Sequence, residues 1–505
     1  MSSTANRVIK NTGYLYAKMV ITMFVSLYTT RLILNALGAS DFGIYNIVGG
    51  AIAMLGFLNA AMASATQRFM SYAEGEGDKE KQKYIFNISV VLHAGIAVFV
   101  AVVLLVAGYF FFNGILNIPA ERMGAAKVVY LSLIISTLLT VMNVPYDAVM
   151  NAHENMRYYA LVGILESFLK LAVAFTCVYT TGDKLIVYGI LMACIPLFTL
   201  SIMKVYCHKH YEECVIKPRI YWDVKLVKEM TTFAGWNFSS AASSMVSQYG
   251  LGIVLNNFWG ALLNAAQGIA NQLSGMLMVF CNTMLKALNP VIAKSKGQGD
   301  DALMYKATFS GCKYSYLLLA VFAIPFMLEM PEILKLWLKN VPDWAVLFAR
   351  LQLARSLVEQ LTIAISTMIS ANGKIKAYSL VKSVLSLLPI VLTYIAYSFA
   401  GSPASMYFFW ILCNGVVAGF FSLYYAKKLC GISISQFISA VIVPCVVITV
   451  AMFIGGSLVV SWCSPSLLRI VITTFITTIL FALFLAVCST KDERKLVVSI
   501  IKRNR

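Results

Sequence analysis

Residues 74–78 of this 505-residue chain read Glu-Gly-Glu-Gly-Asp, and residues 296–300 read Lys-Gly-Gln-Gly-Asp. Both glycines and the final aspartate recur 222 residues apart. The same offset matches earlier residues from Leu37 onward, for example Gly38 with Gly260. A second match, at an offset of 219, pairs residues 152–162 with 371–381. A tandem repeat of several helices is typical of transporters built from two similar lobes with the substrate path between them.

The amino-acid composition indicates the environment in which the chain folds. Hydrophobic residues make up 60% of it and charged residues only 12%, and its mean hydropathy is +0.78. No water-soluble fold could bury so much apolar surface, so we expect an all-α, polytopic membrane protein. A helix needs about 20 apolar residues to cross a bilayer. Segments of that length predict fourteen spans, at 11–36, 42–70, 84–112, 125–150, 158–180, 185–206, 230–257, 262–290, 307–329, 344–370, 378–399, 404–427, 434–460 and 467–488.

The repeat sorts these spans into domains. We expect an N-terminal six-helix lobe at 1–208, a cytoplasmic inter-lobe loop at 209–229 and a C-terminal six-helix lobe at 230–428. Two additional transmembrane helices would follow at 429–490, and a basic cytoplasmic tail at 491–505.

Basic residues set the expected orientation. With a cytoplasmic N-terminus, most of them fall in inner loops such as 79–83, 209–228 and 294–296, and in the tail. The outer loops keep only Arg122, Lys127, Lys184, Lys335 and Lys339. This agrees with the positive-inside rule and places both termini in the cytoplasm. It also explains the net charge of +18 without nucleic acid as a partner, since the basic residues do not gather on one soluble face.

Nothing in the sequence predicts catalysis, a cofactor or a metal. The longest outer loops, 113–124 and 330–343, are too short for an extracytoplasmic catalytic domain, and there is no nucleophile elbow, phosphate loop or zinc-protease helix. His208 and His210 lie near two cysteines in the inter-lobe loop, but without regular zinc spacing. We expect a solvated basic linker there.

A polar stripe marks the expected transport path. At 100° per residue, seven polar residues of the helix expected at 262–290 fall within about 60° of Asn271. A stripe of this kind inside a spanning segment must face a cavity or a protein partner rather than lipid. The members are Asn264, Gln267, Asn271, Ser274, Asn282, Lys286 and Asn289.

The helix expected at 42–70 has a quieter counterpart of polar and small residues, which includes Asn46, Ser64, Gln67 and Arg68. The 222-residue offset superimposes the two stripes, so that Ser64 corresponds to Lys286. We therefore expect the stripes to lie opposite one another across a central cleft.

Positively charged side chains within the membrane are energetically costly. A charge near the bilayer centre costs about 2.5 to 3.5 kcal/mol on the insertion scale. Lys286 and Lys18 have no carboxylate in the membrane part of the first, second, seventh or eighth expected helix. Two roles stay open for Arg31, which could pair with Asp41 or bind substrate near the outer exit. Arg68 could meet an anion entering from the cytoplasm, or extend to the lipid headgroups.

Buried acids elsewhere have bases four residues away, Glu166 with Lys170 and Glu359 with Arg355, as expected for ion pairs within one helix. The expected cleft is therefore net cationic and rich in amides. Lys or Arg suits phosphate, and Asn and Gln suit sugar hydroxyls, so the lining favours an anionic headgroup that carries sugars.

Residues 30–45 carry a family resemblance. An arginine near the end of the first helix is followed by Leu-Gly at 37–38 and by Phe-Gly-Ile-Tyr at 42–45, which opens the second. This resembles the polysaccharide-biosynthesis flippases, the O-antigen (Wzx-like) branch of the multidrug, oligosaccharidyl-lipid and polysaccharide exporter superfamily.

The resemblance implies two six-helix lobes arranged as a V, a central cavity and alternating access. It also implies the cargo, an undecaprenyl-diphosphate-linked oligosaccharide moved between leaflets of a bacterial cytoplasmic membrane, with membrane lipids around its tail. A proton or sodium gradient could drive the cycle. Two alternatives stay open: a cation-coupled multidrug and toxin extrusion antiporter with the same fold, and a membrane polymerase acting on polyprenyl-linked sugars.

Overall fold

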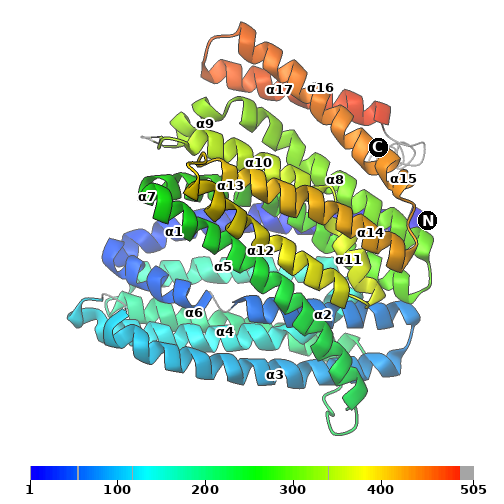
Figure 1. Ribbon diagram of the computed structural model, residues 1–505. Coiled ribbons are helices and arrows are strands. Elements are labelled where there is room, and N and C mark those ends of the chain that lie inside the picture. Colours follow the sequence, from blue (N-terminus) through cyan, green and yellow to red (C-terminus); the bar gives the residue numbers. More distant parts are fainter. Residues whose placement is uncertain (1, 54–55, 116–117, 339–340, 489–505) are drawn as a thin grey trace, which may run out of the picture. The chain divides into compact units, whose positions relative to one another are not determined.

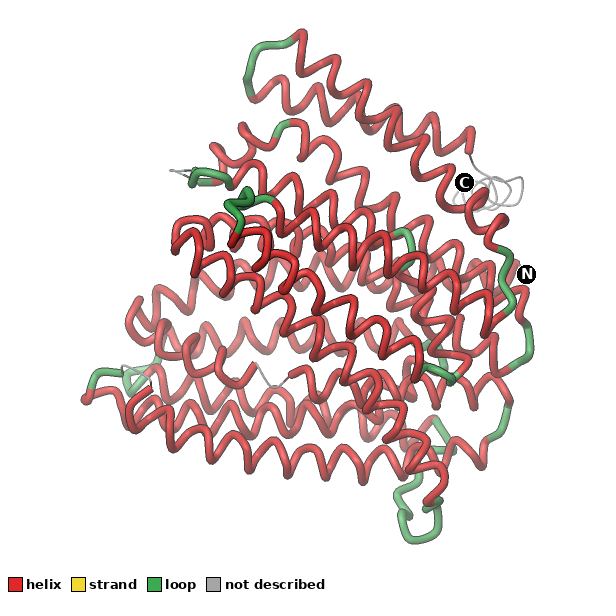
Figure 2. The backbone as a smooth tube through the Cα atoms, viewed as in Figure 1, coloured by secondary structure: helices red, strands yellow, loops and turns green. Residues whose placement is uncertain are grey.

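The computed structural model describes residues 2–53, 56–115, 118–338 and 341–488. Every regular element in these ranges is helical, as the red tube of Figure 2 shows. The chain divides into two compact units. One contains residues 9–238 and 293–300, and the other contains 1–8, 239–292 and 301–505. The expected all-helical class is therefore confirmed.

The unit of residues 9–238 and 293–300 is coloured mostly blue to cyan in Figure 1. Its helices are α1 (Ser2–Ala53), α2 (Gly56–Glu76), α3 (Lys79–Phe110), α4 (Met123–Ala152), α5 (Met156–Tyr179), α6 (Lys184–His210) and both ends of α7 (Val224–Gly297). Helix α1 merges two expected spans across a kink at Gly38, whose φ of 77° is a left-handed conformation that favours glycine.

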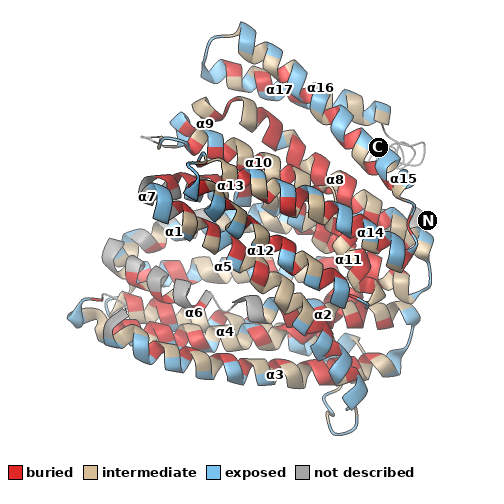
Figure 3. Cartoon of the chain, in the orientation of Figure 1, coloured by how far each residue is buried: buried red, intermediate tan, exposed pale blue. Residues whose placement is uncertain are grey.

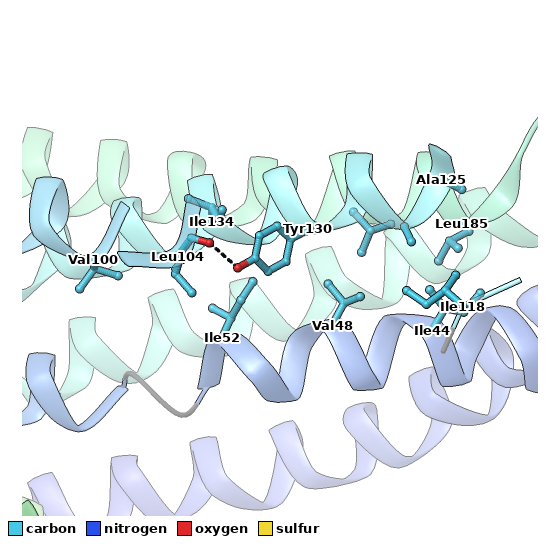
Figure 4. Close-up of a cluster of buried hydrophobic side chains, with 12 residues drawn as sticks. Ile44, Val48, Ile52, Val100, Leu104, Ile118, Ala125, Tyr130, Ile134 and Leu185 are labelled. Carbon is cyan, nitrogen blue, oxygen red and sulfur yellow. Dashed lines mark hydrogen bonds between the residues drawn. The ribbon is translucent and has the colours of Figure 1, made fainter. Parts of the chain in front are cut away.

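Aliphatic side chains form the packed interior of this unit. Ile44, Val48 and Ile52 recur every four residues and so share one face of α1, which lies against α3 and α4 (Figure 4). The Tyr130 hydroxyl donates to the carbonyl oxygen of Leu104 at 2.6 Å, which satisfies a polar group inside the apolar cluster. This packing fixes how α1, α3 and α4 are rotated toward one another.

The second unit holds the central part of α7 and the helices that follow, green to red in Figure 1. They are α8 (Asp301–Leu328), α9 (Met330–Trp337), α10 (Ala345–Gln360), α11 (Ile363–Asn372), α12 (Lys376–Ser398), α13 (Ser405–Trp410), α14 (Ala418–Cys430), α15 (Ile434–Phe437), α16 (Val443–Trp462) and α17 (Leu467–Cys488).

A buried ion pair ties α17 to the end of α8. Glu329 is 0% exposed and accepts from Arg469 Nη2 at 2.8 Å and from the Thr473 hydroxyl at 2.8 Å. Helix α16 also packs on α8. Many residues of α16 and α17 are exposed (Figure 3), and the exposed side chains include the apolar Phe475 and Leu483. Such a surface suits contact with lipid.

The repeat recurs in backbone geometry. Helices α3 and α8 begin 222 residues apart, and each follows a left-handed glycine, Gly77 with φ 73° and Gly299 with φ 71°. At the 219 offset, Glu154 with φ 54° corresponds to Gly373 with φ 88°. Equivalent sequence positions therefore adopt equivalent turns.

Eleven helices in the described ranges are long and apolar enough to cross a membrane. The expected spans 42–70, 230–257 and 344–370 are not among them. The first includes residues 54–55, which lie outside the described ranges, and the third is broken between α10 and α11. The second contains five serines and three asparagines, so it is less apolar. The number fourteen stays a prediction.

Candidate functional site

The polar stripe on α7 is divided between buried and accessible side chains. Gln267 and Ser274 are buried, and Ser274 shares a hydrogen bond with Ser356 of α10 at 2.9 Å. Asn271, Lys286 and Asn289 are partly exposed and Asn282 is exposed. Asn289 accepts a hydrogen bond from Thr367 of α11 at 3.1 Å. Part of the stripe therefore serves packing inside its own unit.

The counterpart stripe in the other unit ends in an arginine held by aromatic rings. The Arg68 guanidinium lies 4.5 Å from the ring centre of Phe69, 5.1 Å from Tyr72 and 5.4 Å from Phe233. Cation–π contacts of this kind stabilise a cation away from water. From the sequence we expected Arg68 either to bind an anion or to extend to the lipid headgroups. Its contacts with three aromatic rings were not predicted. The side chain of Asn46 lies outside the described residues.

Asp41, which was one of two expected partners of Arg31, forms an ion pair with Arg122. Asp41 accepts from Arg122 at 2.8 Å and 2.5 Å, and the same guanidinium donates to Asp183 at 2.7 Å and 3.1 Å. This pairing holds the pKa of Asp183 below its ordinary value. The Arg31 side chain lies outside the described residues. Asp41 thus belongs to a network that joins α1, just after its kink at Gly38, to the N-terminal ends of α4 and α6, which helix periodicity alone could not reveal.

Lys18 lies in a pocket inside one lobe. Its ammonium is 4.3 Å from the ring centre of Tyr159, and its end packs so closely on Gly163 that a Cβ there would overlap it. The cavity holds about 170 Å³ and is also lined by Asp147 and Glu166. The sequence placed no carboxylate in the membrane part of the first, second, seventh or eighth expected helix. The structure shows acids from α4 and α5 around the same pocket.

The other unit contains the repeat-equivalent pocket, with a volume of about 240 Å³. At the 219-residue offset, Tyr159 corresponds to Tyr378 and Gly163 to Lys382, and all four residues line their respective pockets. Each pocket thus contains an amine, but from a different helix. Lys18 of α1 reaches over a glycine in one lobe, and Lys382 of α12 stands at the glycine's equivalent position in the other.

The two predicted pairs at four-residue spacing are confirmed. Glu166 and Lys170 are 2.6 Å apart, and Arg355 and Glu359 are 2.9 Å apart. Glu359 also accepts from Trp410 Nε1 at 2.8 Å, and the Arg355 guanidinium lies 3.7 Å from the Trp410 ring centre. This acid is therefore neutralised inside its own pocket.

The cysteines and histidines near the inter-lobe loop form no metal-binding group among the described residues. Across the described ranges, no three His, Cys, Asp or Glu side chains are placed to hold a metal ion. The His208 ring packs against Phe86 and Tyr146, with ring centres 6.2 and 5.9 Å away. His208 therefore has a packing role in the described structure.

Comparison with known proteins gives the architecture a context. Residues 8–296 match a family described as "Polysaccharide biosynthesis protein". The uncharacterized membrane protein EpsK of Bacillus subtilis (strain 168) is 27% identical over 125 residues, a match that spans 24% of each chain.

Solved structures of transporters share the fold. A MATE protein in a bent conformation is 15% identical with a TM-score of 0.72, over 84% of this chain and 95% of that one. A MOP-superfamily transporter from Pyrococcus furiosus Vc1 is 15% identical with a TM-score of 0.68, over 85% and 96%. At this level of identity the likeness concerns the fold alone, which is that of MOP-superfamily transporters.

Proposed function

Because the chain belongs to the polysaccharide biosynthesis protein family, we propose that it is a flippase for undecaprenyl-diphosphate-linked oligosaccharides. It would move these repeat units across the bacterial cytoplasmic membrane by alternating access, for O-antigen, capsule or exopolysaccharide assembly. Membrane lipids would surround the isoprenoid tail throughout the cycle.

One observation carries this proposal. Residues 239–292, the part of α7 in the second unit, contain six asparagines, three glutamines and one lysine, Lys286, but no aspartate or glutamate. Asn271, Asn282 and Lys286 remain at least partly exposed. An ammonium stabilises a diphosphate, and amides donate to and accept from sugar hydroxyls.

The proposed substrate contacts divide by chemistry. Lys286 and Arg68 would attract the diphosphate, with Arg31 near the outer exit. Asn46, Asn271 and Asn282 would bind sugars. Gln267, which is buried, and Asn289, which accepts from Thr367, would support the stripe from within its own unit. The structure alters the role expected for Lys18 most, because Asp147 and Glu166 line its pocket. Its influence on the cargo would therefore be indirect.

A cation-coupled multidrug antiporter is the second candidate. Its support is the MATE fold together with the carboxylates Asp147, Glu166 and Glu359 in the two lobe pockets. Uncompensated acids suit cationic drugs, but Glu166 and Glu359 are already paired with bases. That pairing favours the flippase. Proton or sodium coupling is compatible with either function.

Native mass spectrometry of the purified protein tests the choice. The flippase predicts a co-purified lipid-linked oligosaccharide that is lost in Lys286→Ala and partly kept in Lys286→Arg, because the charge remains. Lys335→Ala, which removes an exposed lysine, serves as the matched control and should retain the lipid. The antiporter would be favoured if the Lys286→Ala protein still exports a cationic drug and if neither this variant nor the wild type carries a bound lipid-linked oligosaccharide.

A further inference from the structure

The two repeated motifs touch each other in the folded chain. Residues 293–300 belong to the same compact unit as 9–238, so the end of α7 packs on the end of α2. A Cβ on Gly75 would overlap the Lys294 carbonyl oxygen and lie 3.1 Å from Gly297 Cα. A Cβ on Gly297 would overlap the Tyr72 carbonyl oxygen. Gly75 and Gly297 are themselves 222 residues apart, so equivalent residues of the two repeats meet.

Close approach, rather than backbone conformation, explains these two glycines. Gly75 lies within α2 and Gly297 is the last residue of α7, and neither has a positive φ. Alanine would suit a helix better by about 1 kcal/mol. The second glycine of each motif differs, since Gly77 and Gly299 adopt the left-handed conformation that ends a helix. Small residues let two helix backbones come together.

An ion-pair cluster lies beside the glycines. The Lys294 ammonium is 3.5 Å from Glu74 Oε1, and Lys79 and Gln82 donate to Glu74 Oε2 at 2.9 and 2.7 Å. Glu74 immediately precedes Gly75, and Lys294 supplies the carbonyl that Gly75 approaches. Backbone packing and opposite charge therefore act at the same place.

We propose that the Gly75–Gly297 contact is a cytoplasmic latch, which joins the inner ends of the two repeats and separates once in each transport cycle. The expected topology places both motifs at the cytoplasmic face. Cargo that loads from that face needs these ends apart, so the proposal rests on the proposed flippase function.

The chain offers a hinge beside the latch. The boundary between the two compact units crosses α7 between Ile292 and Ala293, and Pro290 lies two residues before it. Proline has no amide hydrogen and bends helices at the preceding turn. The short end of α7 can therefore change direction while the rest of the helix stays intact.

A buried reporter cysteine tests the latch. Ser71 lies one turn before Gly75 on the same face of α2 and is fully buried. In a chain without native cysteines, Ser71→Cys should react slowly with a thiol reagent added to the cytoplasmic side of inverted vesicles. Gly75→Ala or Gly297→Ala should speed the reaction about tenfold, because the added methyl group keeps the backbones apart. Gly95→Ala in α3, where a Cβ meets no atom within 4 Å, is the matched control and should not change the rate.

A second measurement closes the latch deliberately. In the double variant Glu74→Cys with Lys294→Cys, a short reversible bifunctional thiol reagent should stop export, and reduction should restore it. Each single cysteine is the control and should keep its activity. Normal export by cross-linked protein would overturn the proposal, as would equal Ser71→Cys labelling in all well-folded glycine variants. If the glycine variants speed labelling but no variant binds or exports a lipid-linked oligosaccharide, the latch stands and the proposed flippase function fails.

Discussion

Replacing Arg469 with alanine should strongly destabilise the attachment of α17. The substitution removes three hydrogen bonds of 2.8 to 3.1 Å from the Glu329 carboxylate, whose residue is 0% exposed. Among the described residues, this leaves the Thr473 hydroxyl as the carboxylate's remaining hydrogen-bond donor. Removing one partner of a buried ion pair costs about 3 to 5 kcal/mol, because the other charge stays buried without compensation. Thermal unfolding in detergent should show this as a large fall in Tm for Arg469→Ala.

Two comparisons make the result interpretable. Lys335→Ala breaks an exposed pair with Glu332, where the lysine side chain is 65% exposed, and should cost less than about 1 kcal/mol. The double variant Arg469→Met with Glu329→Met should recover most of the loss, since apolar residues of similar size can replace a buried pair at little cost. Equal stability of Arg469→Ala and Lys335→Ala, or no recovery in the double variant, would refute this reasoning.

Further outcomes are expected from the same structure. Lys286→Ala should abolish or sharply reduce surface polysaccharide at normal protein abundance, and Lys286→Arg should keep part of it; full export by Lys286→Ala would place the site elsewhere. Cysteines introduced at Lys81 and Lys427 should resist an impermeant thiol reagent in intact cells, and labelling of both from outside would reverse the orientation. Burial lowers the pKa of His153, but its ion pairs with Glu213 and Glu74 outweigh this and raise it. Protonated His153 therefore stabilises the fold fully below its ordinary pKa, and this contribution is lost as pH rises through the raised pKa. The Tm difference between wild type and His153→Gln should be largest below the ordinary histidine pKa of about 6.5 and shrink as the pH rises above it, and a constant difference would contradict this.

The His153 cluster also shows what the sequence left unseen. His153 Nε2 is 2.5 Å from Glu213 Oε1 and its Nδ1 is 3.4 Å from Glu74, while its ring stacks on Tyr211 with centres 4.2 Å apart. Lys79 and Lys294 are the cations paired with Glu74. These groups come from α2, α3, α7, the turn after α4 and the inter-lobe loop. No spacing along the chain relates them.

The sequence alone determined the features that depend on local geometry. Apolar length predicted the helices, and four-residue spacing placed Glu166 beside Lys170 because helix residues three and four apart are neighbours. The 222-residue repeat matched Gly77 with Gly299, and the structure gives both glycines nearly the same left-handed φ. Each of these follows from 3.6 residues per turn and from matching segments.

Only the tertiary structure decided which helices meet and at what rotation. It paired Asp41 with Arg122, enclosed Lys18 with acids from other helices, and pressed Gly75 against the end of α7. The reason is physical. Helical periodicity fixes which side chains share a face, but the partner of that face depends on the packing of side chains far apart in the chain. In lipid this choice falls to close packing and hydrogen bonds, because every outer face is about equally apolar.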